Sequence, residues 1–117
     1  MLEKMKLQVL SLACVIAAIP LQPVFAQTTS SAGTIKLIGT GWSSAVFGIG
    51  TTAPLVNPAG CATTDQYQEI SANPGYNTDY AAALTAYSTG SQVEVVVSNT
   101  VCTNTRPTII GLYVLGS

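Results

Sequence analysis

Residues 77–98 read Asn-Thr-Asp-Tyr-Ala-Ala-Ala-Leu-Thr-Ala-Tyr-Ser-Thr-Gly-Ser-Gln-Val-Glu-Val-Val-Val-Ser, and this stretch decides the fold. Asn77 is a good N-cap and Asp79 suits the positive end of a helix dipole, so a helix is predicted over 78–89. Gly90 stands where a left-handed glycine ends a helix. Residues 92–98 alternate, with three valines on one face, and predict a strand. A helix leading directly into a strand is therefore the best-defined unit of the sequence.

Four further strands are expected around this unit. Apolar alternation and turn residues predict them at 34–38, 43–49, 62–70 and 108–115. The last of these is apolar on both faces, so we expect it to be buried on two sides. Two connecting segments are polar: residues 27–33, interpreted as a loose leader, and residues 99–107, interpreted as a loop.

The expected order is three strands, one helix and two strands. This order predicts a mainly β fold, a five-stranded OB-like barrel with one helix between strands 3 and 4. Tyr80, Leu84 and Tyr87 lie at positions i, i+4 and i+7, so we expect this face to pack, with Leu84 and Tyr87 closing one end of the barrel. A β-sandwich is the alternative, but it normally needs about seven strands.

The N-terminal segment has the composition of a Sec-type signal peptide. Two lysines precede a mostly apolar run over 7–19, and small or branched residues then predict cleavage after Ala26. A membrane anchor is the alternative, but an apolar run of about 13 residues is shorter than the roughly 20 that span a bilayer. We therefore expect a signal peptide at 1–26 and a single domain at 27–117 that is secreted or periplasmic.

The chain has three cysteines. Cys14 lies in the predicted signal peptide, which leaves Cys61 and Cys102 with one pairing, and we expect a disulfide outside the cytoplasm. Closing this loop would stabilise the domain by roughly 4 kcal/mol in the chain-entropy account. A metal site is the alternative, but the chain has no histidine, and structural zinc normally takes four Cys or His ligands. The sequence therefore predicts neither a metal nor a cofactor.

Few charged side chains follow residue 26, and acidic ones outnumber basic ones. No basic stripe is available for nucleic acid, and no later segment is apolar enough to enter a membrane. With no histidine and no free thiol, the usual proton-transfer and nucleophilic groups are missing, so we expect no catalysis. Asp65 and Glu69 would lie about 13 Å apart on a strand, beyond the ~5–9.5 Å of a glycosidase pair. The carboxylates are therefore interpreted as solvated surface charges.

The helix-to-strand passage carries a family resemblance. Tyr80, three residues, Leu84, two residues, Tyr87, two residues and Gly90, followed by a valine strand, resembles the subtilase cytotoxin B subunit and its small secreted bacterial relatives. The resemblance covers residues 61–115. It implies an OB-fold subunit that assembles in a ring of five, binds cell-surface glycans on the barrel and can accompany an A-type toxin subunit.

The resemblance also carries over site residues, with departures. The family has an aromatic or polar sugar contact in the fourth strand, where this chain has Val97. The sugar-contacting serine at the start of the first strand corresponds to Ser31 or Thr34, and Asp65 and Tyr67 lie in the same general region. The fold therefore carries over better than the lectin activity.

Aromatic residues complete the candidate list. Trp42, the single tryptophan, is expected in the core or a subunit interface; if it were exposed, its ring could stack on a sugar. Tyr76, beside a Pro-Gly turn, is the tyrosine most expected to be exposed. The first functional hypothesis is a secreted, non-catalytic, oligomeric glycan-binding module, and the alternative is a structural or stress-related protein of the same fold. The candidate ligand contacts are Ser31, Thr34, Trp42, Asp65, Tyr67 and Tyr76.

Overall fold

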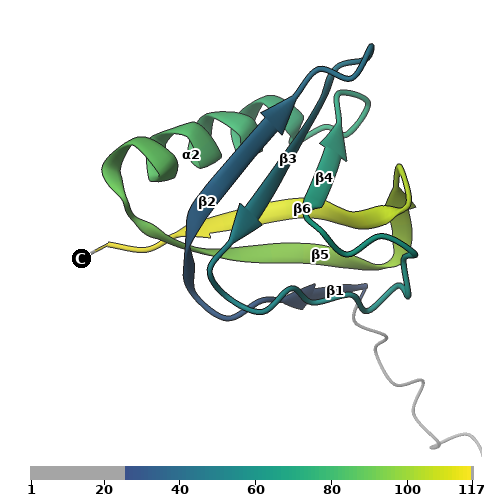
Figure 1. Ribbon diagram of the computed structural model, residues 1–117, viewed down its shortest axis with the longest axis horizontal. Helices are drawn as coiled ribbons and strands as arrows, with labels where there is room; N and C mark the ends of the chain where they lie inside the picture. The colour runs from purple at the N-terminus through teal and green to yellow at the C-terminus, as the bar shows by residue number, and fades with distance from the viewer. Residues whose placement is uncertain (1–25, 117) are drawn as a thin grey trace, which may run out of the picture.

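The computed structural model describes residues 26–116. The predicted signal peptide at 1–26 lies outside this range except for Ala26, an exposed residue that precedes the first strand. Within these described residues the protein is mainly β with one helix, as its sequence indicates. Its elements are β1 (Gln27–Thr29), β2 (Gly33–Thr40), β3 (Val46–Thr51), β4 (Tyr67–Ile70), α2 (Tyr76–Thr89), β5 (Gln92–Thr103) and β6 (Arg106–Val114) (Figure 1).

The strands from β2 to β6 form a closed ring. β2 pairs antiparallel with β3, and β3 pairs antiparallel with β4. β4 meets β6 in one parallel pair, Gln68 with Thr108, and β6 runs antiparallel along β5. β5 closes the ring by pairing with the start of β2. In Figure 1 the strands β2, β3 and β4 cross β5 and β6 at a steep angle, and α2 lies alongside the ring.

A sixth strand, β1, lies at the edge of the ring where a loose leader was predicted. Gln27 to Thr29 pair antiparallel with Val96 to Ser98 of β5. Next to them, the Ser30 backbone N–H donates to the Val95 carbonyl (2.8 Å), and the Val95 N–H donates to Ser30 Oγ (2.9 Å). The leader prediction was wrong because an edge strand needs only backbone partners, which side-chain polarity does not report.

The predicted strands exist with shifted bounds. Of the strand expected at 62–70, only Tyr67–Ile70 forms. The prediction of a loop at 99–107 was wrong. β5 instead continues to Thr103, where it pairs with Arg106 across a two-residue turn. Asn104 and Thr105 in that turn have φ of 48° and 66°, the combination typical of a tight type I′ hairpin.

The last strand, β6, is not buried on both sides as predicted. Ile109 is fully buried, whereas Ile110, Tyr113 and Val114 are exposed. β6 meets β4 only at Thr108, so the later half of the strand has no ring strand on that side. The residues of β6 are therefore apolar on both faces of the strand, but only one of these faces is buried.

The helix forms as predicted but begins and packs differently. Gly75 rather than Asn77 precedes α2, and no side chain among the described residues caps it. Its end is as predicted, because Gly90 is left-handed (φ 70°) and donates its N–H to the carbonyl oxygen of Ala86. The buried positions are Asp79, Ala83 and Ala86.

The prediction that one face of α2 packs against the strands was wrong for two of its three residues. Leu84 and Tyr87 are 45 % and 53 % exposed, so neither closes an end of the ring. Two alanines face the strands instead, because a small side chain lets the helix backbone approach closely. Tyr80 does pack as expected, stacked on Phe47 of β3 with ring centroids 5.0 Å apart.

The core fills the inside of the ring. The predicted alternation of β5 is confirmed, because Val93, Val95 and Val97 are all fully buried. They join buried side chains of the other strands and of the helix. The cluster further includes Ile35, Phe47, Ile49, Tyr67, Ala83, Ala86 and Ile109.

The predicted disulfide is confirmed. Cys61 and Cys102 are bonded with Cα atoms 5.8 Å apart. The bond ties the long connection before β4 to the far end of β5. Next to it, the Thr63 N–H donates to the carbonyl oxygen of Thr105 (2.9 Å). Covalent and hydrogen bonds thus hold the β5–β6 hairpin against the segment that leads into β4.

Candidate ligand-binding site

Two hairpin turns and one β4 side chain surround a hollow of about 350 Å³, here called the hairpin hollow. One turn joins β2 to β3, and the other joins β5 to β6. Its lining is polar apart from one aromatic ring. The lining residues are Trp42, Ser43, Ser44, Gln68, Asn104 and Arg106.

The β2–β3 turn presents Trp42 to solvent. Trp42 is 55 % exposed, so it does not lie in the core of the chain, and its other expected place, a subunit interface, stays a prediction. Trp42 and Ser43 have φ of 49° and 65°, a left-handed conformation that is uncommon for residues other than glycine. The indole lies against Gly39, where an added Cβ would be 2.5 Å from Trp42 Cη2. A glycine backbone therefore supports the ring from beneath.

The β5–β6 turn places Asn104 opposite Trp42. The Asn104 side-chain amide donates to Gln68 Oε1 of β4 (3.0 Å). Gln68 is almost fully buried, so this hydrogen bond fixes the turn to the ring. Asn104 as a whole is exposed. The left-handed backbone of Asn104 and Thr105 is thus held by a contact with a different strand.

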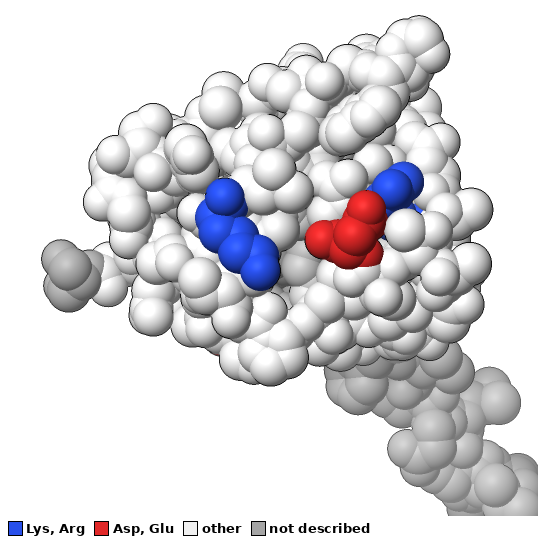
Figure 2. All heavy atoms as spheres, viewed as in Figure 1, with Lys and Arg blue, Asp and Glu red and all other residues white. Residues whose placement is uncertain are grey.

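Arg106 is oriented by an ion pair with Asp65. Its Nε and Nη2 donate to the two carboxylate oxygens of Asp65 at 2.6 and 3.1 Å. Its Nη1 donates to the carbonyl oxygen of Asn104 (3.3 Å). The hydrogen bond and the charge of Arg106 lower the pKa of Asp65. Figure 2 shows how few acidic and basic groups lie on this face of the molecule.

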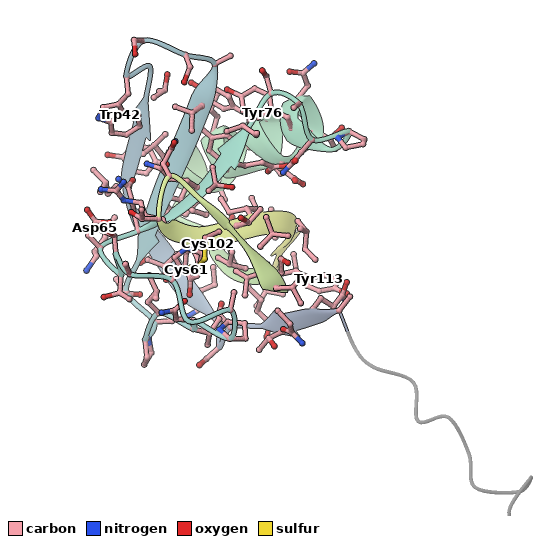
Figure 3. All side chains as sticks on the ribbon, turned by 90° about the vertical axis from the view of Figure 1, so that its right-hand side faces the viewer. Trp42, Cys61, Asp65, Tyr76, Cys102 and Tyr113 are labelled. Carbon is pink, nitrogen blue, oxygen red and sulfur yellow. A yellow bond between two sulfur atoms is a disulfide. The ribbon has the colours of Figure 1, made fainter. Side chains whose placement is uncertain are left out.

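The structure brings together two of the six candidates. Trp42 lines the hairpin hollow, and Asp65 orients Arg106 at its edge. Figure 3 shows Trp42 and Asp65 on the same side of the molecule. Ser31 precedes β2 and Thr34 lies near its start, away from the β2–β3 turn, because a strand rises ~3.3 Å per residue and Thr34 stands six positions before Thr40.

The two tyrosine candidates lie outside the hollow. Tyr67 is 1 % exposed, and its hydroxyl accepts a hydrogen bond from the Val56 N–H (2.9 Å). Tyr76 is half-buried rather than exposed, with its ring edge-on to Phe47 at 5.4 Å. Val97, at the position of the family's fourth-strand sugar contact, is fully buried. These three side chains serve packing.

Gln68, Asn104 and Arg106 were missed by the sequence reasoning. They come from a short strand and from a segment interpreted as a loop, and no spacing links them in the sequence. One local signal was available, because Asn tolerates the left-handed backbone of a tight hairpin.

Of Asp65 and Glu69, both interpreted as solvated surface charges, Asp65 is exposed as predicted, whereas Glu69 is buried together with Asp79. Glu69 is 1 % exposed and Asp79 is 9 % exposed. Burial, a hydrogen bond to Asp79 and the charge of Asp79 raise the pKa of Glu69 from its ordinary 4.5 to about 8. Glu69 follows Gln68 on β4, and neighbouring strand residues point to opposite faces, so this pair lies away from the hairpin hollow.

The comparisons with known proteins leave the site to be interpreted from its geometry. No protein-family model matches the chain, and no curated protein matches it. Within residues 26–116, no helix has the length and apolar character needed to cross a bilayer. The same range contains no group of three or more His, Cys, Asp or Glu residues placed to hold a metal ion.

Proposed function

We propose that this protein is a secreted, non-catalytic module that binds glycans in the hairpin hollow. The observation that carries the proposal is the exposed indole of Trp42 beside the amide of Asn104 and the guanidinium of Arg106. A sugar presents weakly positive C–H groups on one face and hydroxyl groups around its edge. The electron-rich face of an aromatic ring suits the C–H groups of the sugar. Planar amides and guanidinium groups suit its hydroxyl groups.

The polar groups are held in place before a ligand arrives. Asp65 fixes Arg106 through two hydrogen bonds, and Gln68 fixes Asn104. Side chains that are already ordered lose less rotational freedom on binding. The volume of about 350 Å³ lies at the lower end of the roughly 300–1,000 Å³ of small-molecule sites. These features favour a small, hydroxyl-rich ligand group.

The ring of strands supports the further proposal of an OB-like barrel. Five strands close on each other with one helix between the third and the fourth of them. OB-folds bind oligosaccharides and oligonucleotides with the loops after strands 1 and 4 and the face beside them. Here these loops are the β2–β3 and β5–β6 turns, which both line the hairpin hollow. Few positive charges are available, which favours a sugar over a nucleic acid.

The proposal extends to export and assembly. The Cys61–Cys102 bond supports an oxidising compartment, in line with the predicted signal peptide. Leu84 and Tyr87 on the outer face of α2 are exposed apolar groups, which suit a ring built through the helices, as the resemblance to toxin B subunits implies. An A-type toxin subunit is then a candidate partner, and a cell-surface glycan is the candidate ligand.

A glycan array tests the proposal, using protein purified with its disulfide intact. We expect binding to a subset of glycans, confirmed by isothermal titration calorimetry, because the Trp42→Ala variant has no tryptophan left to report binding by fluorescence. Trp42→Ala is expected to weaken binding at least tenfold, because it removes the aromatic face on which the sugar would stack; a nucleic-acid base stacked on one aromatic ring contributes ~1–3 kcal/mol. Tyr113→Ala is the matched control: Tyr113 is 56 % exposed and lies away from Trp42 (Figure 3).

Two results would contradict glycan binding at this site. A flat array with correctly folded protein would favour the alternative of a structural or stress-related protein. Equal losses in the Trp42→Ala and Tyr113→Ala variants would place the ligand elsewhere.

A further inference from the structure

A second hollow lies where β4 leads into α2, and it shares no lining residue with the hairpin hollow. It has a volume of about 240 Å³ and is here called the helix hollow. Pro74, Val101 and Ile110 supply apolar walls, and Glu69, Ser98 and Thr108 supply polar groups. The hollow is thus a largely apolar cavity with a carboxyl group in its lining.

The carboxyl group of Glu69 lacks a cationic partner. Glu69 Oε1 and Asp79 Oδ2 are buried and receive no hydrogen bond from an N–H or O–H donor of another residue among 26–116, so only a proton held between the two carboxyl groups can join them. The basic side chains in that range are Lys36 and Arg106; neither lines the hollow, and Arg106 is paired with Asp65. A buried carboxylate without a partner is costly, so such a group takes up a proton or a cation.

The groups around Glu69 do not supply that cation. The α2 helix contributes Asp79, whose carboxyl group is close enough for a hydrogen bond, and Tyr76, whose phenol is within electrostatic range. Asn73 in the preceding turn hydrogen-bonds to Glu69. Phe47 of β3 is its cross-strand partner, and Ser98 of β5 and Thr108 of β6 are uncharged. The surroundings therefore add negative charge or none.

We propose that the helix hollow binds a primary ammonium group carried on a short alkyl chain. The ammonium group has three N–H donors, which suit Glu69 Oε1, the carboxyl oxygen that receives no N–H donor, and would replace the proton shared with Asp79. The chain would lie against Val101 and Ile110. The volume is below the roughly 300 Å³ at which sites for drug-sized ligands begin, so the chain is short, about four carbon atoms.

Binding of the ammonium group requires Glu69 to give up a proton. Because the pKa of Glu69 is raised to about 8, the empty site holds this proton at neutral pH. The terminal torsion of a glutamate is soft, so a small rotation turns a carboxylate oxygen toward the cavity when the proton leaves. One proton is released per ligand bound. Affinity therefore rises with pH and levels off above about pH 8.

The test uses the full chain and n-butylammonium chloride, followed by ¹H–¹⁵N NMR at pH 6.5 and 8.5 with n-butanol as the uncharged control. An alkylamine resembling the lysine side chain stays charged at both values. The deprotonated fraction of a group with pKa about 8 changes by about 25-fold between them. We therefore expect about 25-fold tighter binding at pH 8.5, with shifts in the amide signals of Gly75, Val101 and Ile110.

Two variants locate the site. Glu69→Gln is expected to abolish binding, whereas Glu94→Gln, which removes a carboxylate that lines neither hollow, is expected to leave it unchanged. Should Glu69→Gln not fold, Ile110→Ser replaces an exposed wall residue and is expected to weaken binding several-fold. Equal binding of n-butanol, an affinity independent of pH, or undiminished binding in a folded Glu69→Gln variant would each overturn the proposal. None of these results depends on whether the hairpin hollow binds a glycan.

Discussion

Replacing Glu69 by glutamine is expected to change how the stability of this protein depends on pH. Glu69 is buried beside Asp79, and its pKa is raised from 4.5 to about 8. The folded protein therefore keeps a proton on Glu69 that the unfolded chain releases near pH 4.5. The stabilisation is complete below pH 4.5 and is lost as the pH rises toward 8. Glutamine cannot ionise, so the Glu69→Gln variant loses this dependence.

The size of the effect follows from the shift. With one extra proton bound in the folded state, the free energy of unfolding falls by about 1.4 kcal/mol per pH unit. Between pH 4.5 and pH 7 the decrease amounts to about 3 kcal/mol, from the pKa of about 8. A small domain has only ~5–15 kcal/mol of stability in total. The effect is thus large enough to measure.

Urea unfolding at pH 4.5, 6, 7 and 8, followed by circular dichroism, measures the dependence. The native chain is expected to lose stability across this range, whereas the Glu69→Gln profile is expected to be about 3 kcal/mol flatter by pH 7. Asp65→Asn is the matched control, because Asp65 is exposed and Arg106 lowers its pKa. Its carboxyl group is ionised in both states over most of this range. Its profile should therefore follow that of the native chain.

One result would refute the reasoning. If Glu69→Gln and the native chain had parallel profiles between pH 4.5 and 8, Glu69 would not carry the extra proton. The buried pair would then be compensated in another way.

Three further predictions follow from the disulfide, the tryptophan and the proposed assembly. Replacing both Cys61 and Cys102 by serine is expected to lower the free energy of unfolding by about 4 kcal/mol; urea midpoints that match those of the native chain would contradict this. Gly39→Ala is expected to displace the indole of Trp42 and shift its fluorescence, since the new Cβ would be 2.5 Å from Cη2; an unchanged spectrum would exclude the packing. Light scattering at micromolar concentration is expected to find an assembly larger than one chain, and a clean monomer would rule out the proposed ring.

Local signals predicted the elements that depend on neighbours in sequence. Gly90 ends the helix because a left-handed residue is needed there, and glycine adopts that conformation readily. The valine alternation of β5 predicted its buried face correctly because side chains on a strand alternate. The Cys61–Cys102 pairing followed because two cysteines outside the predicted signal peptide allow only one intramolecular bond.

The same signals failed where a distant segment decides the outcome. Leu84 is more apolar than Ala83, yet Ala83 is buried because the strands lie close to that side of α2. Glu69 resembles a surface charge, yet β4 directs it toward Asp79 beneath the turn that leads into the helix. Hydrophobicity of one residue does not reveal which neighbour it will face.

The candidate site shows the same division. The sequence offered Trp42 and Asp65 as candidates, but placing Trp42 on the surface required the turn between β2 and β3. Two other segments supply the remaining lining residues Gln68, Asn104 and Arg106. Closure of the ring of strands brings these segments and the β2–β3 turn together.

The sequence by itself determined the mainly β character, the single helix with its glycine end, the valine strand and the one available disulfide. Each of these depends on the backbone preferences of neighbouring residues or on the number of cysteines, and both are properties of the sequence alone. The tertiary structure decided which helix face is buried, that Glu69 is paired with Asp79, and that two distant turns enclose a hollow around Trp42. Those features depend on which segments meet when the ring closes, and that is set by the packing of the whole chain.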